Sequence, residues 1–135
     1  MKTFDVQSIE LQVPSKRAFA YLADPARLPE WTNAFSRVRD GRALLRTPAG
    51  EAEIDLTVEA DAKAGTVDWK MGFPDGSVAM AYSRLVPSGG ERCIYSFVLM
   101  APPVPLEQLE GALAAQSHTL REELDTLRRV LKQHG

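Results

Sequence analysis

The sequence contains little of several residue types that mark particular classes of protein. It has one cysteine, Cys93, among 135 residues, which excludes an intramolecular disulfide and a zinc site built from cysteines. Its 16 lysines and arginines are outnumbered by 18 aspartates and glutamates. We therefore expect no basic face, and neither nucleic acid nor an anionic membrane surface as a partner.

Long apolar runs are also missing from the chain. No run approaches the roughly 18 residues of a membrane span, and the N-terminus lacks the continuous apolar stretch of a signal peptide. We expect a cytoplasmic protein with no membrane insertion. With 44% hydrophobic and 25% charged residues, the composition is typical of one globular domain, which we place at residues 1–135.

Residues that bind metals or cofactors are scarce. The two histidines, His118 and His134, have no spacing that would combine with Cys93 into a metal site. No glycine-rich loop joins a strand to a helix in the way that phosphate binding requires. We expect neither a metal nor a cofactor.

The first 23 residues predict a strand followed by a helix. In SIELQV, residues 8–13, apolar and polar residues alternate, which is typical of a half-buried strand. Pro14 ends this strand, and Ser15 is placed to cap a helix over residues 15–23.

The segment DPARLPEWTN, residues 24–33, places one indole among several helix breakers. Asp24 followed by Pro25 predicts a second cap and a short helical turn, and Pro29 is expected to end that turn. Together these residues orient Trp31. Two interpretations of Trp31 are open: it closes one end of the core, or it forms a wall or gate at the mouth of a site, which Phe35 could share.

Residues 35–100 predict strands throughout. Alternation is clearest in residues 51–60 and 66–71, and turn residues separate the strands, which indicates an antiparallel meander of five or six strands. The last strand, CIYSFVLM at residues 93–100, is apolar on both faces. Each of its faces therefore needs a cover, which could be a helix, a loop or a partner subunit.

A long amphipathic helix follows the APPVP segment. Its leucines recur at alternating spacings of three and four from Leu106 to Leu131, interrupted only by Ser117. The predicted fold is α+β: a curved antiparallel sheet of six or seven strands wrapped around a long C-terminal helix, with two short helices after the first strand. A strongly bent sheet cannot contact the helix everywhere, and ligand sites form in such spaces.

Aromatic and thioether side chains are the candidate lining of such a space. Strand parity places four of them on one face, and two more follow on the next strand: Trp69, Met71, Tyr95 and Phe97, then Met80 and Tyr82. For each residue singly, an ordinary place in the core is the competing interpretation.

Two arrangements of residues 77–86 are open. If the small side chains Ala79, Ala81 and Ser83 face inward, the cavity is roomy. If Met80 and Tyr82 face inward, the cavity is narrower, and the hydroxyls of Tyr82 and Tyr95 both become polar handles for a ligand. Arg84 shares the parity of Tyr82 and could then face an anionic ligand.

Catalytic candidates are weak. Ser117 and His118 are neighbours on the predicted helix and point apart, so they do not form a nucleophile and base pair. Ser117 lies on the leucine stripe, where it could contact a ligand, and His118 lies at its edge. Tyr82, Tyr95 and His118 are the residues that could assist a reaction.

Three segments together resemble the START-like or SRPBCC superfamily, with its polyketide cyclase/dehydrase-like members. They are SIELQVPSKRAFAYLADPARLPEWTNAF at residues 8–35, LVPSGGERCIYSF at 85–97 and LREELDTLRRVLKQ at 120–133. The resemblance implies the helix-grip fold, and either binding of hydrophobic small molecules or lipids or cyclisation of polyketide chains. Because these motifs are structural, they do not choose among the functions.

Three functions are therefore expected, in order. The first is binding of a small hydrophobic or aromatic molecule (lipid-, polyketide- or sterol-like) in an internal cavity between sheet and helix. The second is a polyketide cyclase or dehydratase activity, in which the protein folds a reactive chain into one conformer. The third is a dimeric protein-interaction module, because the last strand and the leucine stripe could form a homodimer.

Overall fold

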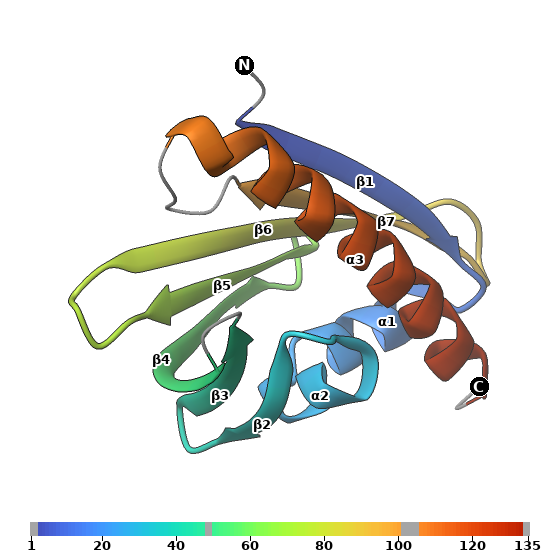
Figure 1. Ribbon diagram of the computed structural model, residues 1–135. Helices are drawn as coiled ribbons and strands as arrows, with labels where there is room; N and C mark the ends of the chain where they lie inside the picture. Colours follow the sequence, from blue (N-terminus) through green and yellow to red (C-terminus); the bar gives the residue numbers. More distant parts are fainter. Residues whose placement is uncertain (1–2, 48–49, 101–105, 134–135) are drawn as a thin grey trace.

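Seven antiparallel strands form one sheet that curves around a long C-terminal helix, as the sequence predicts (Figure 1). The structure is a computed structural model and describes residues 3–47, 50–100 and 106–133. Its elements in chain order are β1 (Phe4–Leu11), α1 (Ser15–Leu22), the 3-10 helix η1 (Pro25–Arg27), α2 (Leu28–Trp31), β2 (Phe35–Arg39), β3 (Arg42–Thr47), β4 (Gly50–Asp61), β5 (Thr66–Gly72), β6 (Val78–Pro87), β7 (Cys93–Met100) and α3 (Leu106–Gln133).

The strand order is β1-β7-β6-β5-β4-β3-β2. Strands β2 to β7 form a meander in which each strand pairs with the next, and β1 pairs with β7. The two edges of the sheet are therefore β1 and β2, and α1, η1 and α2 connect them. The helix α3 lies across the inner, concave face (Figure 1).

The short helices confirm one predicted cap and correct two other details. Asp24 caps η1, because its Oδ1 accepts a hydrogen bond from the Ala26 N–H at 3.1 Å. The cap predicted for Ser15 is wrong: the N-cap position is Pro14, which makes no side-chain cap bond, and Ser15 is the first helical residue. Pro29 does not end the helical segment. It lies in the first turn of α2, where its missing N–H leaves no bond unmade.

The leucine stripe of α3 covers the core, as predicted. Leu113, Leu120, Leu124, Leu127 and Leu131 are at most 4% exposed. The side chains of Leu106 and Leu109 lie outside the described residues. Cys93 is a buried free thiol on β7. In the described ranges no helix is long and apolar enough to cross a membrane.

Candidate functional site

The inner face of the sheet changes from fully buried to half-buried along its strands. Near the C-terminal half of α3, the inward residues Leu11, Val67, Leu85 and Tyr95 are at most 4% exposed. Further along the strands the inward apolar residues are only partly covered: Met71, Phe73, Ala79, Ala81 and Leu99. We call this half-buried apolar surface the open end.

An aromatic cluster lies between the buried part and the open end. The rings of Trp69 and Phe97 are stacked, with centroids 5.9 Å apart and planes at 27°. The ring of Trp31 is tilted relative to that of Trp69, with centroids 6.5 Å apart. The rings of Tyr95 and Phe97 meet edge to face, with centroids 6.4 Å apart. The four rings come from α2, β5 and β7, so they connect the short helices to the centre of the sheet.

Two polar atoms of this cluster are buried without a partner. Trp69 Nε1 and Tyr95 Oη are inaccessible to solvent, and within the described residues neither makes a hydrogen bond of good geometry, although the Ser83 side chain lies near enough to Tyr95 Oη to act on its pKa as a hydrogen-bonding neighbour. Burial raises the pKa of the Tyr95 hydroxyl far above its usual range, and the nearby Ser83 side chain opposes this shift. The Ser83 hydroxyl itself donates to the carbonyl of Val67. Since most buried polar groups in proteins are bonded, each unpartnered donor needs an explanation.

Register decides which face of β6 looks inward. Trp69 pairs with Ala81 and Met71 pairs with Ala79, so the small residues of β6 share the inner face with the large residues of β5. Tyr82 is 41% exposed on the opposite, outer face. The roomier of the two predicted arrangements is therefore the observed one, and the narrower arrangement is wrong.

The outward-facing residues of β6 cannot contact a ligand on the inner face of the sheet. Met80 and Tyr82 point away from α3, because they alternate with Ala79 and Ala81, which share the inner face with Met71 and Trp69. Arg84 also points outward, and its Nε donates to the carbonyl of Ala64 at 3.3 Å. An anionic ligand inside the fold would not meet this guanidinium.

A polar pair on β1 was not anticipated from the sequence. Asp5 and Gln7 have the inward parity of Ile9 and Leu11 and are half-buried. Gln7 Nε2 donates to Asp5 Oδ2 at 2.9 Å and to the carbonyl oxygen of Ser117 at 2.7 Å. Asp5 pairs with Leu99, so its carboxylate side chain stands beside the open end. Extending the alternation of residues 8–13 backward would have indicated both residues.

The α3 candidates have different outcomes. Ser117 is half-buried at the predicted stripe position, and its backbone carbonyl bonds to Gln7. The His118 side chain is 76% exposed and pairs with Glu122 at 3.1 Å, so His118 faces away from the inner face. His134 lies outside the described residues. Among those residues, no group of histidine, cysteine, aspartate and glutamate could hold a metal ion.

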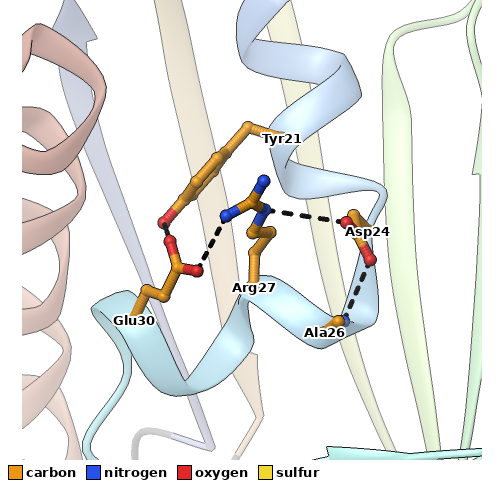
Figure 2. Close-up of polar contacts among 5 residues, drawn as sticks. All are labelled: Tyr21, Asp24, Ala26, Arg27 and Glu30. Carbon is orange, nitrogen blue, oxygen red and sulfur yellow. Dashed lines mark hydrogen bonds and ion pairs between the residues drawn. The ribbon is translucent and has the colours of Figure 1, made fainter. Parts of the chain in front are cut away.

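Trp31 and Phe35 are 4% and 8% exposed and belong to the hydrophobic core, on the side of the short helices. A role for them in a ligand site stays a prediction. A polar network fixes the turn that carries Trp31 (Figure 2). Glu30 accepts from Tyr21 Oη and from Arg27 Nη1, both at 2.9 Å, and Arg27 also pairs with Asp24 at 3.7 Å. Burial and the bond to Glu30 raise the pKa of Tyr21.

Glu123 connects α3 to the turn between α2 and β2. Its Oε2 accepts from the Asn33 N–H at 2.7 Å, directly after α2. Burial raises the pKa of Glu123, while backbone hydrogen bonds from Asn33 and Ala34 oppose the shift. The sequence does not indicate this residue, because a glutamate on the polar side of a helix has no local signal.

Open grooves also flank α3. One of about 390 Å³ lies between β1 and α3, and one of about 520 Å³ lies between the α2–β2 turn and α3. Neither is lined by the aromatic cluster. An internal cavity at the cluster therefore stays a prediction.

Comparison with solved structures identifies the architecture. The chain superposes on a START superfamily protein from Mycobacterium smegmatis with a TM-score of 0.69 and 13% identity, covering 99% of this chain and 100% of that one. This chain has the START-like fold. The Zhui aromatase/cyclase from Streptomyces sp. R1128 matches with a TM-score of 0.63 and 8% identity over 95% and 90% of the two chains.

The di-domain aromatase/cyclase BexL, from the BE-7585A biosynthetic pathway, gives a TM-score of 0.68 and 15% identity over 96% of this START-like chain and 46% of that protein. No family model matches the sequence. No curated protein matches it either. At these identities the likeness concerns the fold, so the function rests on the residues of the site.

Proposed function

We propose that the protein binds a small hydrophobic or aromatic molecule between the inner face of the sheet and α3, at the open end. The observation that carries this proposal is the pair of buried, unpartnered donors, Trp69 Nε1 and Tyr95 Oη, in an aromatic cluster beside half-buried apolar surface. A bound molecule with hydrogen-bond acceptors would provide partners for these two donors, which the protein itself leaves without one.

The apolar residues of the open end supply the affinity in this proposal. Covering half-exposed side chains such as Met71 and Leu99 removes apolar surface from water, at roughly 25 cal/mol per Å². The indole and phenol groups would then orient the ligand. The START superfamily protein and the two aromatase/cyclases of the same fold support a small organic ligand of this kind.

Intrinsic fluorescence offers a direct test. Both tryptophans of the chain, Trp31 and Trp69, lie in the cluster, so a ligand bound there should change their emission and raise the melting temperature. The probe is a matched pair of similar shape, 2-acetonaphthone and 2-ethylnaphthalene, of which only the first accepts a hydrogen bond. We expect the ketone to bind about tenfold more tightly, as one added hydrogen bond provides.

Variants separate the roles of the two donors and the apolar surface. Trp69→Phe or Tyr95→Phe should reduce the preference for the ketone, whereas Tyr82→Phe, on the outer face, should leave it unchanged. If a broad panel of lipids and aromatic compounds changes neither the fluorescence nor the melting temperature, the proposed function is wrong. Equal binding of the two naphthalenes would refute the role of the donors alone.

A cyclase or dehydratase activity is the second candidate, and Asp5 favours it. Its carboxylate stands beside the open end, held by Gln7 at 2.9 Å, where it could accept a proton from a folded poly-β-ketone chain. The assay is cyclised product formed from such a chain. Asp5→Asn should lower the rate, while Glu10→Gln on the outer face of β1 should not. Equal rates would exclude Asp5 from the chemistry.

A further inference from the structure

The exposed large hydrophobic residues of the described chain gather on one surface. All seven lie on the outer face of three adjacent strands, β1, β7 and β6, opposite to α3. We call them the outer apolar patch: Phe4, Val6, Val78, Tyr82, Val86, Ile94 and Met100. The registers place them in two neighbouring groups. Phe4 pairs with Met100, and the half-buried Val98 links Val6 to Tyr82, while Val86 pairs with Ile94 beyond the polar row of Ser8, Ser96 and Arg84.

The apolar area of the patch is larger than scattered single hydrophobic residues would expose. Its members are each 38% to 56% exposed. Since an aromatic side chain offers about 150–250 Å² and the valines and isoleucine offer less, the patch exposes on the order of 500 Å² of apolar surface. The largest apolar patch of a typical monomer is about 300–600 Å² and is often functional. The ligand site on the opposite face of the sheet makes no use of this surface.

We infer that the outer apolar patch is the interface of a homodimer, in which two sheets pack face to face. A standard interface buries about 800 Å² per partner, and homodimer interfaces are about 65% apolar. These values require about 500 Å² of apolar surface from each copy, which the patch provides. The arrangement would be a sheet-on-sheet sandwich related by a two-fold axis.

Charge favours a second copy as the occupant. The seven patch residues are uncharged, and the charge that lies among them on the outer face of β6 is Arg84, whose Nε donates to the carbonyl of Ala64 at 3.3 Å. Two copies therefore meet mainly through uncharged side chains, although each chain carries a net charge of −2. The polar groups among and beside them are largely paired within the chain: Ser8 Oγ bonds Ser96 Oγ at 2.9 Å, and Arg92 pairs with Glu10 at 3.9 Å. A partner of opposite charge is therefore not required.

The test compares one charge placed inside the patch with the same charge placed outside it. Val6→Glu puts a carboxylate in the patch, and a two-fold interface would bury it twice. Thr57→Glu makes the same change on the outer face of β4, opposite Lys70 and away from the patch. Sedimentation velocity across a concentration series gives the dimer dissociation constant, and circular dichroism shows that both variants fold.

We expect a concentration-dependent dimer for the wild type and for Thr57→Glu. For Val6→Glu, we expect a dissociation constant raised by about a hundredfold or more, since an unpaired carboxylate is costly to bury. Wild-type protein that stays monomeric into the millimolar range would overturn the inference, as would a Val6→Glu dimer of unchanged affinity. Monomers that co-sediment with phosphatidylcholine vesicles would assign the patch to a lipid surface instead.

Discussion

The hydroxyl of Tyr95 offers a sharp test of the site, because its removal should stabilise the free protein. The residue is 0% exposed, and within the described residues its Oη makes no hydrogen bond of good geometry. Its polar neighbour, the Ser83 hydroxyl, donates to the carbonyl of Val67 instead. Tyrosine to phenylalanine substitutions in a core usually remove a hydrogen bond and cost stability. Here the folded state has already lost the bonds that the hydroxyl makes to water in the unfolded state, so Tyr95→Phe removes a penalty.

The magnitude follows from the cost of leaving a buried polar group unsatisfied. That cost is about 1–3 kcal/mol, and the void left by one oxygen atom cancels part of the gain. We therefore expect Tyr95→Phe to raise the free energy of unfolding by about 1–2 kcal/mol. For a chain of 135 residues, an unfolding entropy of about 2.1 cal/mol/K per residue converts this to an increase of about 3–7 °C in the melting temperature.

Urea denaturation and thermal unfolding of the ligand-free protein provide the measurement. Tyr82→Phe is the matched control, because its hydroxyl is on the exposed outer face and should change stability by less than about 0.5 kcal/mol. A loss of about 1 kcal/mol or more in Tyr95→Phe would mean that the hydroxyl has a partner in solution. The unpartnered donor, and the ligand argument built on it, would then be refuted.

Three further substitutions test the surrounding structure. Trp31→Ala should lower the free energy of unfolding by about 3–5 kcal/mol, because the indole is 4% exposed against Trp69; a stable variant with altered ligand affinity would instead mark Trp31 as a gate. Gly65→Ala should destabilise the fold in urea titrations, because Gly65 has φ +75° and an added Cβ would overlap the carbonyl oxygen of Leu85; an unchanged midpoint would show that the β4–β5 turn relaxes. Glu123 has a raised pKa, so its contribution to stability is fully present below the unfolded pKa of about 4.3 and is lost as pH rises through the folded pKa; this pH dependence should be missing in Glu123→Gln and is checked by denaturation from pH 4 to 7.

The sequence predicts the faces of some strands better than others. In β4 and β5, apolar residues such as Ile54 and Trp69 alternate with charged ones, and the structure confirms the faces that the alternation indicates. In β6, both faces carry apolar residues, and local pattern cannot choose between them. Pairing of Trp69 with Ala81 decides the choice, and such pairing between strands is not visible in a local pattern.

The polar groups of the site were the least predictable part. Gln7 bonds the carbonyl of a residue 110 positions away, and Glu123 bonds the backbone of a turn 90 positions away. Hydrogen bonds over such separations depend on the assembled fold. By contrast, Asp24 caps the helix that follows it through the N–H of Ala26, only two residues further along the chain. The sequence predicts this cap because the chemistry of a cap is local.

Contacts are distributed unevenly along α3, so that one helix could serve both stability and the proposed binding. Its C-terminal half is fixed to the rest of the chain, because Arg17 donates to the carbonyl of Leu131 at 3.0 Å and Glu123 accepts from Asn33. Leu124, Leu127 and Leu131 there are at most 3% exposed. At Ser117 the leucine stripe is interrupted, and a hydrogen bond from Gln7 takes the place of apolar packing.

This change from apolar to polar contact occurs along β1 where the inner face of the sheet becomes half-buried. Ile9 lies on the buried side of Gln7, and Asp5 lies on the side of the open end. A core closed at one end can supply the free energy of folding without the other end being filled. The open end is then free to keep half-buried apolar surface, which the proposed ligand would cover, beside the buried aromatic cluster that holds the two unpartnered donors.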